Sequence, residues 1–302
     1  MIQEVLGIDV GGTNVKISPV NQDGEVLSKE KFPTKPLYED GKFLYNFTSI
    51  IKDQLIKYPL IKKIGIGVPG TITKDRMGII SLPNIQGMDN IQIIPELKST
   101  FPDHDFFLEN DAAAATLGEY KFSKEKMPDD VIFITLGTGV GGGAVLDGKI
   151  FTGGDGNAME VGHVVASNGK TIEHNIGKRG IINIAADILK NSKEDSLMRS
   201  LKVLDIKDIN KCAKKGDKLA REVFVTVGTY LGECIVSCVR VLDIKFILIG
   251  GGISKNIKYI EKSMWAEIHK FLPASYTDNM KIKAASMGND AGIMGAASLC
   301  FQ

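Results

Sequence analysis

An aspartate followed by a glycine turn is the first stretch of the chain that could do chemistry. Asp9 comes after the apolar residues of a predicted strand, and a turn of small residues follows it. Backbone N–H groups around such a turn bind anions, and nearby side chains add donors and a cation: Gly11, Gly12, Thr13, Asn14 and Lys16. A carboxylate beside a phosphate needs a cation between them, so Asp9 is a candidate Mg²⁺ ligand through water. A plain tight hairpin capped by Asp9 explains this stretch alone equally well.

The same pattern begins again in the second half of the chain. An apolar strand from residue 131 leads into Gly137, Thr138 and Gly139, with Thr135 standing where Asp9 stood. The stretch matches GxGxxG, but a strand and a turn follow it, whereas a dinucleotide fingerprint opens a helix. We therefore interpret it as a second phosphate loop in a weak internal repeat. Two such turns facing each other across a cleft could grip one polyphosphate.

Asn110 and Asp111 lie where a predicted strand ends and an alanine-rich helix begins. A carboxylate at that point accepts backbone N–H bonds and feels the helix dipole, which lowers its pKa. Asp111 would then be ionised and able to take a proton from a substrate hydroxyl. An ordinary helix cap is the alternative interpretation, and it is the commoner role of such a residue.

Glu160, His163 and Glu173 are close in sequence and carry groups that bind hydroxyls. Carboxylates and an imidazole make paired hydrogen bonds to vicinal hydroxyls, which suits a sugar. The alternative is a solvated loop together with a histidine that is bonded to a core carbonyl. We predict no structural zinc site, because no cysteine occurs between His163 and Cys212.

The elements that position these residues follow from hydrophobic spacing. Strands are predicted within 4–20 and at 25–30, 63–68, 105–108, 131–146, 245–249 and 281–285. Helices are predicted at 40–58, 110–120, 181–190, 206–215, 217–242, 256–271 and 290–299. Each half begins with a three-stranded meander that carries a glycine turn. We therefore expect an α/β chain of two domains, 1–122 and 123–302, with the helix of 290–302 returning to the first.

Composition excludes several classes of protein. The 302 residues carry a net charge of +1, so no bulk field attracts nucleic acid or an anionic membrane. The four cysteines and the lack of a signal-peptide pattern predict a cytoplasmic protein with reduced thiols. The apolar stretch 223–242 is long enough to span a membrane, but Glu233 and Arg240 lie inside it. We expect a buried helix there, in which Gly228 and Gly232 let another backbone approach closely.

Taken in order, these motifs resemble the ROK family of bacterial sugar kinases and repressors, within the actin and hexokinase superfamily. The resemblance covers essentially the whole chain. It rests on residues 7–16, Gly-Val-Pro-Gly at 67–70, Leu-Pro-Asn at 82–84, Glu-Asn-Asp-Ala at 109–112, and residues 136–143, 160–163 and 249–253.

The resemblance implies two ribonuclease-H-like domains with mixed β-sheets flanked by helices and an interdomain cleft. It implies ATP and Mg²⁺, with Asp111 as the base for the 6-hydroxyl of a hexose and Asp9 helping to hold the metal. The turns at 11–14 and 137–139 would bind phosphates, and Gly251, Gly252 and Ile253 would lie near adenosine. The implied sugar-binding residues are Gly70, Asn84, Asn110, Asp111, Glu160, His163 and Glu173. A homodimer is expected at the level of the family.

One departure from the family pattern affects the metal. Many members carry a CxCGxxGCxE zinc loop after the Gly-His pair, and the better alignment of this chain lacks that loop. Ile172, Glu173 and Gly177 then match the family's Leu-Glu…Ser-Gly segment that follows it. We therefore assign the sugar-contacting glutamate to Glu173 and predict no zinc site.

The leading hypothesis is an ATP-dependent glucose kinase. Mannose, fructose, N-acetylglucosamine or N-acetylmannosamine as the substrate, and polyphosphate as the donor, are alternatives within the same class. The family's repressors need a helix-turn-helix domain before the kinase fold, and a phosphate turn beginning at Asp9 leaves no room for one. An actin-like filament subunit would not need Glu160, His163 and Glu173 together.

Overall fold

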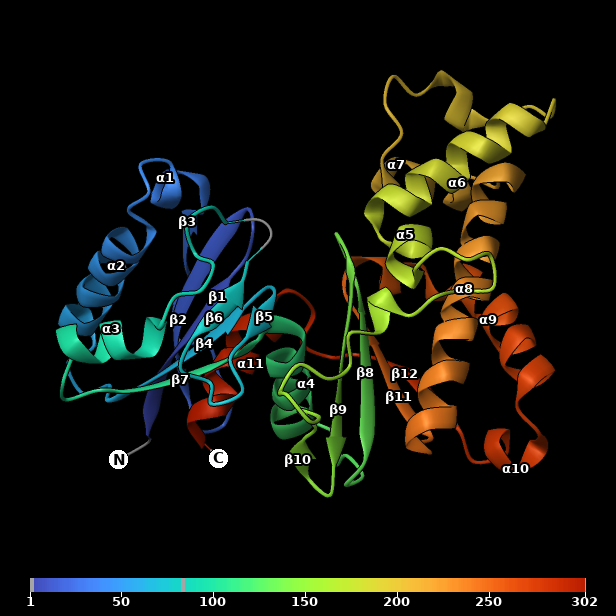
Figure 1. Ribbon diagram of the computed structural model, residues 1–302. Coiled ribbons are helices and arrows are strands. Elements are labelled where there is room, and N and C mark those ends of the chain that lie inside the picture. The colour runs from blue at the N-terminus through green and yellow to red at the C-terminus, as the bar shows by residue number, and fades with distance from the viewer. Residues whose placement is uncertain (1–2, 83–84, 302) are drawn as a thin grey trace. The chain divides into compact units, whose positions relative to one another are not determined.

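The computed structural model describes residues 3–82 and 85–301 of the chain. It contains two compact units, shown with all elements in Figure 1. Unit 1 comprises residues 1–129, 143–159 and 289–302, and unit 2 comprises residues 130–142 and 160–288. The division expected after residue 122 stays a prediction.

Unit 1 is built on a five-stranded sheet with the order β3-β2-β1-β4-β7. The strands are β1 (Glu4–Val10), β2 (Asn14–Asn21), β3 (Glu30–Pro33), β4 (Lys63–Val68) and β7 (Asp105–Asn110). The first three are antiparallel, and β4 and β7 run parallel to β1. A small hairpin of β5 (Thr71–Ile72) and β6 (Ile79–Ser81) follows β4. The carboxyl ends of β1, β4 and β7 therefore share one edge of the sheet.

The side chains of β1 alternate between the two faces of this sheet, which explains its helix layers. Leu6 and Ile8 pack in the core with α2 (Phe43–Lys57) and α3 (Ile93–Thr100). Val5 packs on the opposite face with α11 (Ala291–Ser298). Glycines in β1 and β4 let α11 lie close to the strands, because a Cβ at Gly7 or Gly65 would overlap its backbone. The other helices of the unit are α1 (Lys35–Tyr38) and α4 (Asp111–Phe122).

A second five-stranded sheet, formed mostly by unit 2 with β10 from unit 1, repeats the plan in the order β10-β9-β8-β11-β12. The strands are β8 (Val131–Leu136), β9 (Val140–Leu146), β10 (Lys149–Ile150), β11 (Phe246–Gly250) and β12 (Lys281–Ala284), and β9 runs across the division between the units. An antiparallel strand pair joined through β8 to two parallel strands is the arrangement of the first sheet, so the predicted repeat is confirmed at the level of topology. The helices are α5 (Ile172–Ile176), α6 (Lys178–Asn191), α7 (Ile206–Lys214), α8 (Lys218–Leu242), α9 (Ile257–Phe271) and α10 (Ala274–Thr277). Short 3-10 turns lie at 161–163, 197–200, 252–256, 288–290 and 299–301.

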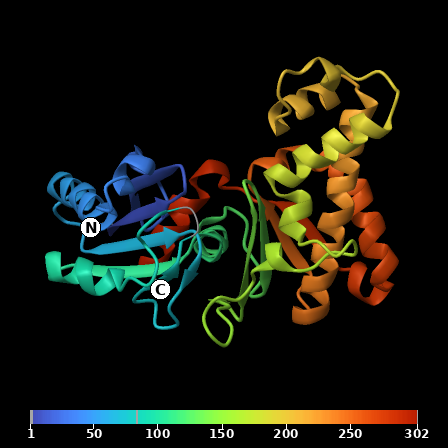
Figure 2. The same ribbon diagram turned by 45° about the horizontal axis from the view of Figure 1, so that its top comes forward.

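The long apolar stretch forms α8, which passes the length and composition test for a membrane span. Its most apolar window is 56% buried, and residues such as Val227, Leu231 and Ile235 are wholly buried in unit 2. A Cβ at Gly228 would overlap Ser263 and Ile260 of α9, and one at Gly232 would overlap Glu267. The expected buried helix with a close neighbour is confirmed, and Figure 2 shows α8 and α9 side by side.

The predicted bounds of the third strand, 25–30, are wrong. The Asn21 side chain accepts hydrogen bonds from the N–H groups of Asp23 and Glu25 and so extends the turn. Regular pairing with β2 resumes only at β3, where Pro33 lies opposite Asn14. The β5–β6 hairpin, α3 and α5 were not predicted, because their patterns are too short for periodicity to identify.

Candidate functional site

The glycine turn of unit 1 is a braced hairpin tip between β1 and β2. The N–H of Gly11 donates to the carbonyl of Asn14 at 2.9 Å. Thr34 holds the turn from the side, since its Oγ1 donates to the carbonyl of Gly11 at 2.6 Å and its N–H to that of Thr13 at 3.0 Å. No sequence pattern links Thr34 to the turn, because the two are brought together only by the pairing of β2 with β3.

Asp9 and Lys16 lie opposite each other in the β1–β2 register and form an ion pair of 2.7 Å. The Asp9 side chain is 14% exposed and lies against Gly292, at the start of α11, where a Cβ would overlap the carboxylate. Mg²⁺ in phosphoryl-transfer sites is commonly held by one or two carboxylates, water and substrate phosphates. A single carboxylate beside a phosphate turn fits that chemistry. Among residues 3–82 and 85–301, no group of three or more His, Cys, Asp or Glu could hold a metal on its own.

Asn110 and Asp111 connect β7 to α4 at the same edge of the sheet. The Asn110 side chain accepts bonds from the N–H groups of Ala112 and Ala113, and its amide donates to the carbonyl of Gly70 at 3.1 Å. The Asp111 carboxylate accepts a bond of 2.7 Å from the N–H of Ala112. The Asn110 side chain therefore caps the start of α4 and also fixes the loop at Gly70. Asp111 is oriented by the first turn of α4. Asn84, the remaining predicted residue of this unit, lies outside the described residues.

The glycine turn of unit 2 links β8 to β9. The N–H of Gly137 donates to the carbonyl of Gly139 at 2.9 Å, and Thr138 accepts a bond of 3.0 Å from the first N–H of α6, that of Lys178. Gly251 has φ +82 and lies so close to Leu136 that a Cβ would overlap its carbonyl. The structure therefore brings the predicted adenosine residues to the turn. A Cβ at Gly252 would meet no protein atom within 4 Å, whereas the Ile253 side chain is buried and only the backbone of that residue is accessible to a ligand of the predicted kind.

Glu173 joins this glycine turn to the hydroxyl-binding cluster. Its Oε2 accepts a bond of 2.9 Å from the N–H of Val140 and lies against Gly139, where a Cβ would overlap it. Glu160 and His163 are held in one 3-10 turn, in which the N–H of His163 donates to the carbonyl of Glu160. Burial raises the pKa of Glu160 above its ordinary value, with His163 opposing this and Glu173 adding to it. These three side chains therefore form one electrostatic group.

Comparisons with known proteins identify the family of the chain. The family model described as "ROK family" matches residues 5–302. The chain belongs to the ROK family. A glucokinase from Halalkalibacterium halodurans is 31% identical over 98% of this chain and 94% of its own length. A solved structure of a candidate sugar kinase from Cytophaga hutchinsonii is 39% identical, with a TM-score of 0.94 over 99% of this chain and all of its own. A ROK glucokinase from Streptomyces griseus, solved with glucose and AMPPNP, is 27% identical, with a TM-score of 0.80 over 99% of both chains.

These neighbours confirm the predicted fold class, two mixed sheets flanked by helices as in ROK kinases. In unit 1 of this ROK protein, the predicted residues gather where β1, β4 and β7 end. In unit 2 they gather around the β8–β9 turn. Sequence patterns located the residues of unit 1 and the β8–β9 turn, because these motifs lie at the ends of buried strands. Glu160, His163 and Glu173 lie outside the strands and were selected by residue type and closeness in sequence.

A buried ion pair behind Asn110 was not predicted. Glu109 accepts a bond of 3.1 Å from Nε of Arg76, on the β5–β6 hairpin, and another of 3.0 Å from the N–H of Asn110. Burial raises the pKa of Glu109, although Arg76 and the Asn110 N–H both oppose this. In this ROK protein the pair ties the β5–β6 hairpin to the residue that caps α4. The one sequence signal for a role of Glu109 was its position immediately before the predicted site residue Asn110.

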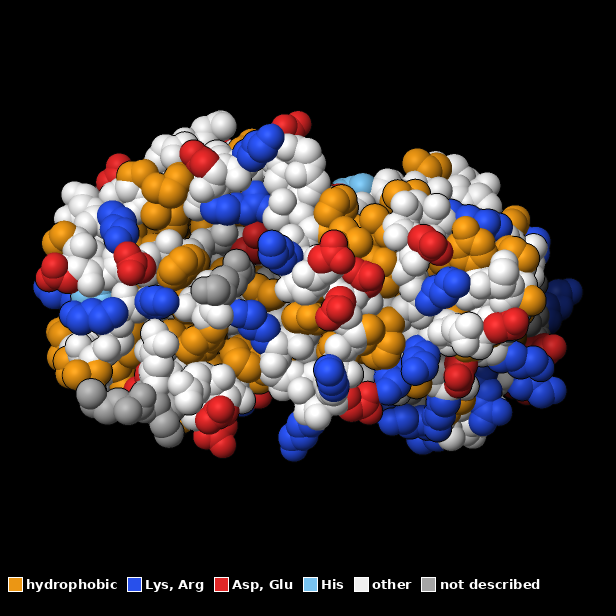
Figure 3. Space-filling model, turned by 90° about the horizontal axis from the view of Figure 1, so that it is seen from below, with side chains coloured by type: hydrophobic (Ala, Val, Ile, Leu, Met, Phe, Trp, Pro, Cys, Tyr) orange, Lys and Arg blue, Asp and Glu red, His pale blue; other side chains and the backbone are white. Residues whose placement is uncertain are grey.

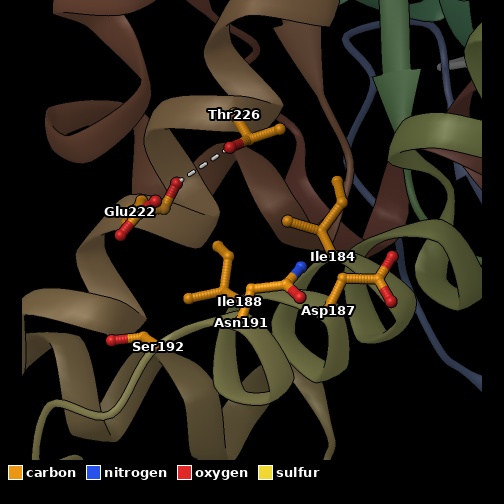
Figure 4. A pocket seen from close by; sticks show the side chains of 7 residues that line it. All are labelled: Ile184, Asp187, Ile188, Asn191, Ser192, Glu222 and Thr226. Carbon is orange, nitrogen blue, oxygen red and sulfur yellow. Dashed lines mark hydrogen bonds between the residues drawn. The ribbon is translucent and has the colours of Figure 1, made fainter.

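A separate groove of about 380 Å³ lies between α6 and α8 of this ROK protein. Figure 4 shows Ile184 and Ile188 on one wall and Glu222 and Thr226 on the other. Its lining includes none of the predicted site residues. The groove therefore belongs to the helical layer of unit 2 and is separate from the residues expected to bind substrate.

Proposed function

We propose that this ROK-family sugar kinase transfers the terminal phosphoryl group of ATP to the 6-hydroxyl of glucose. The observation that best supports this proposal is the position of Glu173. Its carboxylate bonds to the glycine turn and lies near enough to Glu160 to help raise the pKa of that carboxyl. A kinase for sugars needs hydroxyl-binding and phosphate-binding groups in contact, because positioning and charge neutralisation supply most of the catalysis.

The residues of unit 1 would act on the reacting groups. Asp111, oriented by the N–H of Ala112, takes the proton from the 6-hydroxyl as the oxygen attacks phosphorus. Backbone N–H groups of the 11–14 turn and the Lys16 ammonium bind phosphate oxygens. Asp9 would hold Mg²⁺ through water, and a bound Mg²⁺ neutralises charge on the phosphates. Asn110 and Gly70 support the sugar side, where Asn84 is also expected.

Glucose and ATP are the proposed partners because of two relatives. The curated relative from Halalkalibacterium halodurans is named a glucokinase, and the Streptomyces griseus enzyme was solved with glucose and an ATP analogue. The Glu160, His163 and Glu173 cluster suits vicinal hydroxyls, which mannose and the N-acetylhexosamines also offer. Glucose is therefore the first sugar to test, and the others define its specificity.

The test is ADP release from Mg-ATP with glucose, mannose, fructose, N-acetylglucosamine and N-acetylmannosamine, and sugar phosphate formation from polyphosphate. We expect the highest kcat/KM with glucose and ATP. Preference for another hexose would correct the substrate, and a faster reaction with polyphosphate would correct the donor. No turnover with any sugar, together with sugar-dependent binding to DNA, would replace the kinase with a repressor.

We also propose a cytoplasmic location and a homodimer. The four cysteines are all free and buried, as suits a reducing compartment. Both acidic and basic side chains occur on the face shown in Figure 3, with Lys and Arg side chains gathered at its lower right. Light scattering of the purified protein would test the dimer.

A further inference from the structure

Glu233 is the carboxylate in the mostly apolar middle of helix α8, and the proposed reaction gives it no role. Its two oxygens bind one residue of a neighbouring hairpin. Oε2 accepts a bond of 2.9 Å from the N–H of Ser167, and Oε1 accepts one of 2.7 Å from its hydroxyl. An acidic side chain on a core helix is thus used to fix the tip of a loop.

A reciprocal amide pair fixes the same hairpin from its other side. Nδ2 of Asn168 donates to Oδ1 of Asn175 at 2.8 Å, and Nδ2 of Asn175 donates to Oδ1 of Asn168 at 3.1 Å. Asn175 is 6% exposed and lies in α5, where its amide also donates to the carbonyl of Thr171. Asn168 further donates to the hydroxyl of Tyr230 on α8 at 3.0 Å.

The hairpin closed by these bonds runs directly between two proposed sugar-binding residues. Val165 pairs with Thr171, and the N–H of Ile172 donates to the carbonyl of Val164 at 2.9 Å. His163 precedes this pairing and Glu173 follows it. Most of the hairpin is exposed, with Val165 at 66%, and burial anchors it only at Ala166 and at its last residue, Ile172. Polar bonds worth about 0.5–1.5 kcal/mol each must therefore set its conformation.

The two ends of the hairpin differ in how they are held. Glu173 is anchored independently, by Val140 and by the first turn of α5. The His163 side chain is 71% exposed, and its Nε2 lies 4.0 Å from a Glu160 oxygen, beyond hydrogen-bonding distance. The place of the imidazole is therefore set by its backbone, which continues into the hairpin.

We infer that Glu233, Asn168 and Asn175 are positioning residues that hold the 164–172 hairpin on α8 and α5 and thereby set His163 for the sugar. The inference rests on the proposed function for the identity of the ligand. It concerns contacts within unit 2 alone. The group it controls is the imidazole, and the phosphate turn and Asp111 do not depend on it.

Glu233→Ala and Asn168→Ala should each raise the sugar KM about tenfold, with kcat within about threefold and the ATP KM within about twofold of wild type. Glu233→Gln should restore a near-normal sugar KM, because its amide can still bond to the N–H and hydroxyl of Ser167. Glu222→Ala is the matched control on α8, since that carboxylate lines the separate groove, and it should leave all constants unchanged.

A double-mutant cycle separates positioning from a general loss of structure. In a His163→Ala background, Glu233→Ala should change the sugar KM by less than about twofold, because the group it positions is gone. An undiminished tenfold effect there, an equal rise in both KM values, or a wild-type sugar KM in Glu233→Ala would overturn the inference.

Hydrogen exchange keeps this test distinct from that of the proposed function. Backbone amides of 164–172 should exchange at least about tenfold faster in Glu233→Ala than in Glu222→Ala, without any substrate present. If wild type phosphorylates no sugar, the proposed function fails, and exchange alone decides whether the hairpin is held as inferred. Unchanged exchange would reject the hairpin's dependence on Glu233 even in an active kinase.

Discussion

The carboxylate of Glu173 accepts a hydrogen bond of 2.9 Å from the backbone N–H of Val140, at the end of the β8–β9 glycine turn. Bonding to a backbone amide fixes the orientation of the carboxylate. It also means that a residue expected to bind sugar is part of the structure expected to bind phosphate. A substitution in the turn should therefore change sugar binding.

The two glycines of this turn test that connection, because neither has a positive φ and only one touches Glu173. In Gly139→Ala the new Cβ would displace the carboxylate, and kcat/KM for the sugar should fall about 100-fold. In Gly137→Ala the Cβ meets no protein atom within 4 Å, so the sugar KM should stay within about twofold, and the ATP KM should rise if phosphate lies against the turn. Steady-state kinetics of both variants decide the matter. Equal kcat/KM values for the sugar in the two variants would show that the turn does not affect sugar binding through Glu173.

Asp111→Asn should lower kcat by about 10²–10⁴-fold while the sugar KM changes by less than about threefold. The amide keeps the size of the side chain and an oxygen to accept the N–H of Ala112, so shape is preserved and the base is lost. Asp105→Asn, at the other end of β7, is the control, since it alters only an exposed ion pair with Lys98. Turnover near wild type in Asp111→Asn would remove Asp111 from the role of base.

Gly292→Ala should raise the Mg²⁺ concentration needed for half-maximal activity about tenfold, because its Cβ would press on the Asp9 carboxylate. Gly154→Ala is a suitable control, as a Cβ there meets nothing within 4 Å. The measurement is a Mg²⁺ titration at saturating sugar and fixed ATP. An unaltered titration curve in Gly292→Ala would argue against Asp9 as the metal ligand.

The raised pKa of Glu160 predicts that sugar binding depends on pH. Its pKa is raised from 4.5, chiefly by burial, so it takes up a proton at a higher pH than an ordinary carboxyl. If the ionised form binds sugar hydroxyls, the sugar KM should rise as pH falls through the raised pKa. In Glu160→Gln the sugar KM should lose this dependence on pH. Folding stability depends on pH in the opposite direction to sugar binding. Because the folded pKa is raised, the contribution to stability is present below the unfolded pKa and is lost as pH rises through the folded one. A sugar KM that stays constant from about pH 7 to 4.5 in wild type would exclude the role.

Sequence patterns located the residues that sit on strand ends, and they failed where a partner is distant. Asp9 and Asn110 lie at the ends of strands and Gly137 directly follows one, so a local pattern was enough. Thr34 and Arg76 act on residues 23 and 33 positions away, and only folding brings them there. The ion pair of Lys16 with Asp9 was equally hidden, although alternation along a hairpin places the two opposite each other.

The matching strand orders of the two sheets place residues of their first parallel strands at equivalent positions. Asp9 lies beside Gly67 in the parallel register of β1 with β4, and Thr135 lies beside Gly250 in that of β8 with β11. The two positions are equivalent, yet one holds a carboxylate and the other a neutral hydroxyl. If Asp9 holds Mg²⁺ as proposed, Thr135 leaves the equivalent place in the second sheet without a charge to share that role.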